Sequence, residues 1–234
     1  MQVLELWRFP VKSLQGEQLD VAEITADGIA GDRSYALFDL GTGFGLTARR
    51  VPELLFSSAR VVDGGVEITL PDGSIAIDDG QLSDWLGRRV ALRRAADVAT
   101  REYENPLDFE HDAHWMAFEG APGAFHDSRR TRVSLVSTGT LGAWDRRRFR
   151  ANVVVDGDGE DTWVGSTVAI GDVRLDVGTR IDRCVMTTRP QPGGIDRDLD
   201  VLRTIHRARD GCLAVGALVA HPGAVRIGDV VAAS

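Results

Sequence analysis

A cysteine-centred segment is the first place where this sequence could do chemistry. Cys184 lies in the run Arg183-Cys184-Val185-Met186-Thr187-Thr188, with a basic neighbour before the thiol and two hydroxyls after it. A cation close to a thiol, here Arg183 or Arg180, favours the thiolate, which binds metals and attacks electrophiles. A free cysteine is also among the most buried residue types and often acts only as a small hydrophobic side chain. The local sequence leaves both interpretations open.

The second candidate is the only lysine among the 27 basic residues of the chain. Lys12 lies in Phe9-Pro10-Val11-Lys12-Ser13, directly after a predicted strand and a proline turn. An ammonium group held on a preformed turn suits an anionic ligand such as a phosphate. The alternative is a solvated surface lysine.

Several arginines recur at the ends of predicted strands, where a planar guanidinium could match a phosphate or carboxylate. The segments are Gly31-Asp32-Arg33, Thr47-Ala48-Arg49-Arg50 and Phe149-Arg150-Ala151-Asn152. Ser137 and Thr138 stand at the start of a predicted helix. Their hydroxyls and N–H groups could bind an anion or simply cap that helix.

Three further clusters favour structural roles. His111-Asp112-Ala113-His114, with His126-Asp127 beyond it, has no spacing typical of a zinc site. The acidic residues between Asp156 and Asp161 lack the glutamate that would complete a calcium loop, because residue 167 is threonine. Cys212 begins an apolar run, which indicates a thiol in the core.

The elements that must position these residues are mainly short strands punctuated by Asp-Gly and Gly-Asp turns. The predicted strands are Gln2–Trp7, Val21–Thr25, Ser34–Asp39, Ser57–Val62, Val66–Leu70, Ser74–Asp78, Val90–Arg94, Val133–Ser137, Asn152–Val155, Val168–Ile170, Val173–Val177 and Cys184–Thr187. The predicted helices are Gln81–Leu86, Thr138–Arg147 and Leu199–Arg209, the last of which has apolar residues at spacings of three and four and Asp198 near its start. Two hairpins are predicted, one joining Val66–Leu70 to Ser74–Asp78 and the other joining Thr167–Ile170 to Val173–Asp176. The pattern predicts a mainly β protein with closed or partly closed barrels.

Composition excludes several classes of protein. The chain has 234 residues, of which 43% are hydrophobic and 26% charged, values typical of a globular protein. Its net charge of −8 argues against a nucleic-acid binder. No apolar run reaches the ~20 residues of a membrane span, and no secretory signal is visible. Two cysteines do not make a disulfide framework, so we expect a reducing, cytoplasmic location without membrane attachment.

A change in composition divides the chain. Residues 100–127 are acidic, contain two prolines and show little periodicity. We expect a long loop here, of the kind that often covers a functional site. The predicted units are an N-terminal β unit over residues 1–98 and a larger C-terminal β unit over residues 99–234.

Taken together and in order, these segments resemble the MOSC family, named for the C-terminal domain of molybdenum cofactor sulfurase. The branch with an N-terminal β-barrel, which includes the mitochondrial amidoxime-reducing component and bacterial relatives, is the more similar. The resemblance spans nearly the whole chain and implies a MOSC N-terminal β-barrel packed on a MOSC β-barrel, with a few short helices. It rests on Trp7–Ser13, Gly28–Arg33, Leu46–Arg49, Val133–Leu141, Arg148–Asn152, Asp161–Trp163, Arg183–Thr188 and Gly223–Val230.

The resemblance also implies roles for individual residues. Cys184 takes the place of the protein ligand to molybdenum, and Lys12 and Ser13 take the places that contact the phosphate side of the pyranopterin. The remaining positions implied to bind the cofactor are Arg33, Arg49, Ser137, Thr138, Arg150 and Asn152.

The implied activity is reduction of a small N-hydroxylated substrate at the molybdenum cofactor (molybdopterin). Two cysteines cannot supply the four ligands of an iron–sulfur cluster. We therefore expect electrons from a separate ferredoxin, flavoprotein or cytochrome.

Three alternatives remain open. Cys184 could carry a persulfide in a sulfur-carrier or cofactor-delivery module. The cavity could store cofactor or another anion without catalysis. Pyridoxal phosphate is a weak association of the wider family, and Lys12 is the one side-chain amine that could form its Schiff base.

Overall fold

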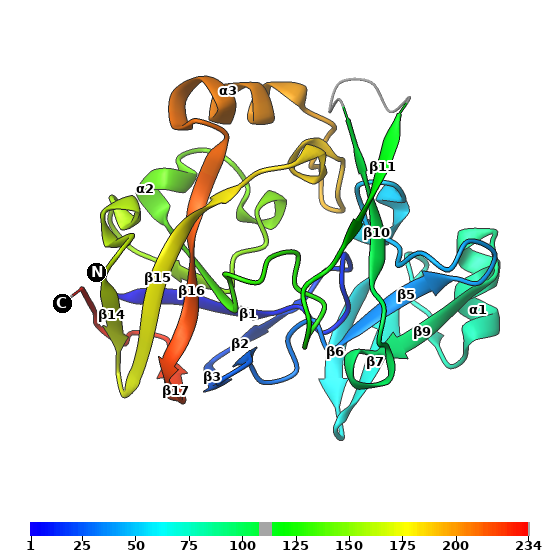
Figure 1. The fold of residues 1–234 in the computed structure, drawn as a ribbon, viewed down its shortest axis with the longest axis horizontal. Coiled ribbons are helices and arrows are strands. Elements are labelled where there is room, and N and C mark those ends of the chain that lie inside the picture. Colours follow the sequence, from blue (N-terminus) through cyan, green and yellow to red (C-terminus); the bar gives the residue numbers. More distant parts are fainter. Residues whose placement is uncertain (108–113, 234) are drawn as a thin grey trace.

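The structure is a computed structural model that describes residues 1–107 and 114–233. Strands dominate it, as the sequence predicts, and helices are few and short. Figure 1 shows a large unit built around a long twisted sheet and a small unit beside it. The mainly β fold is confirmed.

The large unit contains a sheet of eight strands in the order β18-β14-β15-β16-β12-β13-β1-β2. Strands β12 and β13 run parallel, and the other neighbours are antiparallel. The bounds are β1 Val3–Arg8, β2 Glu17–Leu19, β12 Val133–Ser137, β13 Val153–Val155, β14 Thr167–Ile170, β15 Val173–Asp182, β16 Cys212–His221 and β18 Val231–Ala233.

A second sheet completes the core of the large unit. It has the order β17-β3-β4, formed by Gly223–Arg226, Val21–Thr25 and Gly28–Ile29. Along β3, Ala22 and Ile24 are buried and their neighbours more exposed, the period of two expected for a strand with one face on a core. They pack with apolar residues of β12–β16 in one cluster.

The small unit has two further sheets, a helix and its own core. The sheets are β5 (Tyr35–Asp39) with β9 (Val90–Arg94), and β6 (Ser58–Val62) with β7 (Gly65–Thr69) and β8 (Ile75–Ala76). Helix α1 spans Asp79–Leu86, and the 3-10 turns η1 and η2 span Pro52–Phe56 and Ala95–Asp97. The β7–β8 and β14–β15 pairings confirm the two predicted hairpins.

The N-terminal strands β1–β4 belong to the large unit, whereas Val11 and Leu14, between β1 and β2, pack in the core of the small unit. Strand β1 pairs with β13, β3 pairs with β17, and Val3 and Leu6 pack in the larger core. The N-terminal segment therefore contributes residues to the cores of both units.

Helix α3 (Leu199–Arg209) has the predicted bounds. Asp198 caps it by accepting a hydrogen bond from the N–H of Asp200. The helix predicted over Thr138–Arg147 is much shorter: α2 covers Thr138–Leu141, and a 3-10 turn η3 covers Arg146–Arg148. The chain leaves α2 at Gly142, whose φ of 56° ends the helical path.

The strand predicted at Cys184 is wrong. The segment predicted as the strand Cys184–Thr187 forms a 3-10 turn, η5 (Val185–Thr188). The hydroxyls of Thr187 and Thr188 donate to carbonyls three residues earlier, which favours a turn over an extended strand.

The acidic stretch 100–127 is not a structureless loop. It contains a pair of antiparallel strands, β10 (Glu102–Pro106) and β11 (Trp115–Glu119), which rises from the small unit (Figure 1). Cross-strand pairing and the burial of Tyr103 order it. Of the helices in the described ranges, none has the length and apolarity to cross a membrane.

Candidate functional site

A cavity of about 550 Å³ lies where the large and small units meet. The small unit contributes the Lys12 turn and the end of the Arg49 segment, and the large unit contributes the segments around Arg150 and Cys184. Seven of the nine predicted cofactor residues line it: Lys12, Ser13, Arg33, Arg49, Arg150, Asn152 and Cys184. They come from five segments far apart in sequence.

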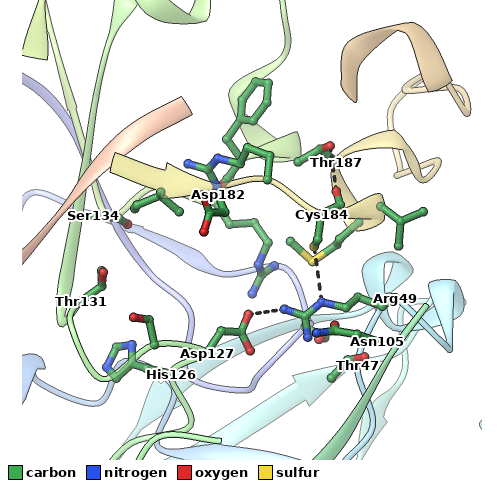
Figure 2. A pocket seen from close by; sticks show the side chains of 18 of the residues that line it. Thr47, Arg49, Asn105, His126, Asp127, Thr131, Ser134, Asp182, Cys184 and Thr187 are labelled. Atoms are coloured by element: carbon green, nitrogen blue, oxygen red, sulfur yellow. Dashed lines mark hydrogen bonds and ion pairs between the residues drawn. The ribbon is translucent and has the colours of Figure 1, made fainter. Parts of the chain in front are cut away.

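Cys184 stands immediately before η5, and its sulfur faces a guanidinium across the cavity. Arg49 Nε donates to Cys184 Sγ over 3.3 Å (Figure 2). The expected neighbour Arg183 is engaged elsewhere, since it donates to the backbone oxygens of Leu213 and Phe149. Arg180 pairs with acidic groups of the large unit. The cation at the thiol therefore comes from the small unit and not from the neighbouring sequence.

Asp127 lies at the centre of the cationic wall. Its carboxylate accepts from Lys12 Nζ and, over 2.6 Å, from Arg49 Nη2 (Figure 2). Its side chain is 50% exposed and lines the cavity. Burial alone would raise the pKa of Asp127, but Arg49 and Lys12 outweigh it and hold the pKa well below its usual range. From the sequence, Asp127 belongs only to the His/Asp cluster for which a structural role is predicted.

The two cations beside Asp127 respond differently to burial. Burial lowers the pKa of Lys12, and Asp127 restores only part of it. Burial also acts to lower the pKa of Arg49, but Asp127 and Cys184 raise it above its usual value. Lys12 also donates to the carbonyl of Phe125 and lies 4.7 Å from the centroid of the Tyr103 ring. The lysine is buried and bonded, not a solvated surface group.

Three residues of the cavity wall adopt left-handed backbone conformations. The φ angles of Ser13, Arg33 and Arg150 are 70°, 50° and 53°. Such conformations cost free energy in residues with a Cβ and cluster at functional sites. Ser13 Oγ accepts from the N–H of Ala48 over 3.0 Å, which fixes the backbone next to Arg49.

Arg150 and Arg183 are positive charges without a carboxylate partner among the described residues. Arg150 Nη1 donates to the carbonyl of Leu14. Burial, together with repulsion from Arg33, lowers the pKa of Arg150 to about 9. Burial lowers the pKa of Arg183 to about 10. A buried excess of positive charge is stabilised by an anion.

Asn152 joins three strands of the large sheet. Its Oδ1 accepts from the backbone and the hydroxyl of Ser134, and its Nδ2 donates to the carbonyl of Trp7. The side chain lines the cavity while its amide holds β1, β12 and β13 together.

The structure does not bring Ser137 and Thr138 to the cavity. Ser137 Oγ donates to Glu160 Oε2 over 2.5 Å and caps α2 by accepting from the N–H of Thr140. Thr138 Oγ1 donates to the carbonyl of Gly157. Glu160 is fully buried and also accepts from Thr140 Oγ1, so these hydroxyls serve a buried carboxylate and a helix start.

No group of three or more potential metal ligands among His, Cys, Asp and Glu occurs within residues 1–107 and 114–233. Residues 111–113 of the His/Asp cluster lie outside the described residues. Burial, reinforced by Arg33, lowers the pKa of His126 to about 3 and keeps it neutral. Its Nε2 has no hydrogen-bond partner in the described chain.

Cys212 is not a core thiol. It begins β16, is only partly buried, and donates through Sγ to Asp182 Oδ1 over 3.1 Å. Burial and this carboxylate raise its pKa.

Comparison with protein families gives two matches that cover almost the whole chain. Residues 1–117 match the MOSC N-terminal beta barrel domain, and residues 123–232 match the MOSC domain. The matches meet between residues 117 and 123, later in the chain than the predicted division at 98/99.

Two curated relatives and a solved structure illustrate the similarity. The molybdenum cofactor sulfurase of Drosophila grimshawi is 26% identical over 92% of this chain, which spans 31% of that protein. The mitochondrial amidoxime reducing component 2 of Bos taurus is 26% identical over 83% of this chain and 68% of its own length. The YuaD protein of Bacillus subtilis aligns over 98% of this chain and 93% of its own, with a TM-score of 0.43 and 14% identity.

Proposed function

The chain belongs to the MOSC family, and from this premise we propose that its cavity binds the molybdenum cofactor and that the loaded protein reduces N-hydroxylated substrates such as amidoximes. One observation carries the proposal: a thiol and several buried cations converge on one cavity. The thiol suits a soft metal, and the cations suit a phosphate.

The thiol end of the cavity fits a molybdenum centre. Cys184 Sγ opens on the cavity and accepts a hydrogen bond from the Nε–H of Arg49. A hydrogen bond from outside the coordination shell orients a metal ligand and tunes its basicity. Cys184 would hold the metal, and Arg49 would fix the direction of the sulfur.

The cationic end fits an anion of phosphate type. Arg33, Arg150 and Lys12 bring more positive charge to the wall than Asp32 and Asp127 neutralise. Thr47 Oγ1 and His126 Nε2 are buried polar atoms of the lining without a hydrogen-bond partner in the described residues. Unmade hydrogen bonds cost free energy that a polar ligand could recover. The volume lies within the roughly 300–1,000 Å³ of ligand pockets.

The bound molybdenum centre would supply the two-electron exchange that cleaves the N–O bond of a hydroxylamine or amidoxime, with two protons taken up and water released. The residues of the chain bind and orient. Asp127 stays ionised at neutral pH because of Arg49 and Lys12, so it can accept a hydrogen bond from an N–H or O–H of the substrate. A separate ferredoxin, flavoprotein or cytochrome would deliver the electrons.

Turnover of a defined substrate tests the proposal. Protein produced in a cofactor-synthesising host is supplied with reduced methyl viologen and benzamidoxime, and benzamidine formation is measured. We expect wild type and Cys212→Ala to form benzamidine and Cys184→Ala to form none above background. Molybdenum-loaded wild type that reduces no amidoxime or hydroxylamine would contradict the reductase proposal and favour storage or delivery of the cofactor.

A second candidate is a sulfur-carrier function, favoured by the open position of the same thiol and by similarity to molybdenum cofactor sulfurase over 92% of this chain. Arg49 would then stabilise the departing or attacking sulfur. Incubation with a cysteine desulfurase and cysteine, followed by alkylation and mass spectrometry, distinguishes the two. A persulfide on Cys184 in protein without molybdenum supports the carrier. Its absence there, with molybdenum bound in loaded protein, supports the reductase.

A further inference from the structure

A phenylalanine behind the cavity wall contacts two of its arginines. The Cζ atoms of Arg33 and Arg150 lie 5.3 Å and 4.3 Å from the centroid of the Phe9 ring. Both arginines line the cavity, whereas Phe9 is buried, is not part of the cavity lining, and lines a separate small hollow together with Arg150. The ring therefore contacts the cations and not a ligand in the cavity.

The backbone of Phe9 is tied to the same cluster. Its N–H donates to Asp32 Oδ1 over 2.7 Å, and its carbonyl accepts from the N–H of Arg33 over 2.7 Å. The other oxygen of Asp32 pairs with the guanidinium of Arg33. Asp32 thus supplies one negative charge, and Arg150 is left with the Leu14 carbonyl and the face of the Phe9 ring.

Arg33 and Arg150 carry like charges and contact the same ring, so they repel one another unless something holds them. Arg33 Nη2 reaches within 3.5 Å of the Arg150 carbonyl, and both residues have left-handed backbone conformations. The negative face of an aromatic ring attracts a guanidinium, and more strongly where water is excluded. One ring that attracts both side chains fixes their separation.

We propose that Phe9 is a positioning residue that holds Arg33 and Arg150 as a two-guanidinium clamp for a phosphate-type oxyanion in the cavity. The inference rests on the proposed function only in taking this anion to be the phosphate of the molybdenum cofactor. Gly16 makes room for the ring, because a Cβ there would lie 2.6 Å from Phe9 Cδ1. Two guanidinium groups can together donate several charge-assisted hydrogen bonds to one phosphate. If Arg33 and Arg150 were displaced from this arrangement, those hydrogen bonds would be lost.

Inorganic phosphate is the probe, measured by calorimetry on protein made in a host that cannot synthesise the cofactor. Phe9→Leu keeps an apolar side chain but removes the aromatic face, and we expect it to weaken phosphate binding about tenfold. Phe9→Tyr keeps the face and should stay within about threefold of wild type. Phe38→Leu is the matched control, since Phe38 is a buried ring that does not line the cavity. It should lower the melting temperature without changing phosphate affinity.

A double-mutant cycle separates positioning from general packing. In an Arg150→Lys background, Phe9→Leu should change phosphate affinity by less than about threefold, because the contact on which it acts is already altered. Three results would each overturn the clamp. They are additive losses of phosphate affinity in the double mutant, an unchanged phosphate affinity in folded Phe9→Leu, and no phosphate binding by wild type. The cycle could also show the expected coupling in a protein that never acquires molybdenum in a cofactor-synthesising host. That result would uphold the clamp and refute the proposed function.

Discussion

The two thiols of the chain occupy neighbouring places in the structure but opposite electrostatic surroundings. Cys212 pairs in register with Asp182 and donates to its carboxylate, whereas Cys184, two residues beyond Asp182, accepts from Arg49. Burial and a carboxylate raise the pKa of Cys212, and a guanidinium from the small unit contacts Cys184. The difference shows that the partner brought by the fold, and not the sequence around a cysteine, sets the electrostatic surroundings of its sulfur.

Arg49→Met should have the largest effect on the difference between Cys184 and Cys212. It removes the guanidinium from Cys184 while leaving an unbranched side chain of similar length. Because a lost outer-sphere hydrogen bond costs about 10–100-fold in metal affinity, we expect molybdenum retention during dialysis to fall by that factor. The exposed Arg174→Met on β15 is the control and should retain the metal. Equal retention by both variants would show that the Arg49–Cys184 contact has no part in metal binding.

Asp127→Asn tests whether the cationic wall needs its carboxylate. Loss of one member of a buried ion cluster costs about 3–5 kcal/mol, and we expect about 2 kcal/mol here because the side chain is half accessible. The pKa of Asp127 is lower in the folded than in the unfolded chain. Its stabilisation is therefore fully present above about pH 4 and is lost as the pH falls further.

Urea unfolding of Asp127→Asn across pH 2–7 measures this effect, with the exposed Asp20→Asn as control. The difference between wild type and Asp127→Asn should be largest at neutral pH and shrink in acid. A difference independent of pH would contradict the ion cluster.

Ser137→Ala sharpens the assignment of polar residues to the cavity. Loss of the cap and of one donor to Glu160 should cost about 1 kcal/mol of unfolding free energy. The molybdenum content should not change, because Ser137 lies outside the cavity lining. A lower metal content in fully folded Ser137→Ala would restore the role implied by the family resemblance.

Asp182→Asn should reduce the electrostatic difference between Cys212 and Cys184, because it removes the carboxylate beside Cys212. In a Cys184→Ala background, removal of the carboxylate lowers the raised pKa of Cys212 and increases its thiolate fraction. We expect iodoacetamide alkylation at pH 8 to accelerate about threefold, with the rate profile shifted to lower pH. An unchanged profile would mean that burial alone raises this pKa.

Local patterns predicted much of the fold. Apolar spacing and an Asp cap gave the bounds of Leu199–Arg209, and turn dipeptides gave both hairpins. The strand prediction over Cys184–Thr187 is wrong because it rests on β-branched residues, which favour strands. Threonine hydroxyls can also hydrogen-bond to the nearby backbone and stabilise a turn, as they do here. The pairing of β1 with β13 is a long-range contact that no local pattern encodes.

The site was predictable where residue type and family resemblance agreed. Lys12, Arg33, Arg150 and Cys184 meet in one cavity although they are far apart in sequence. Asp127 was missed because nothing in an aspartate at the end of an acidic stretch indicates its ion pairs with Lys12 and Arg49, which come from distant segments. Ser137 has the same local pattern whether it caps a helix or binds an anion.

The molybdenum content of protein from a cofactor-synthesising host tests the central claim most directly. Wild type, Cys184→Ala and Cys212→Ala are purified in parallel and analysed for metal and pterin. The account predicts about one molybdenum per chain in wild type and Cys212→Ala, and about tenfold less or lower in Cys184→Ala, because only the thiol beside Arg49 faces the cavity. Metal absent from wild type, or retained in full by Cys184→Ala, would contradict it.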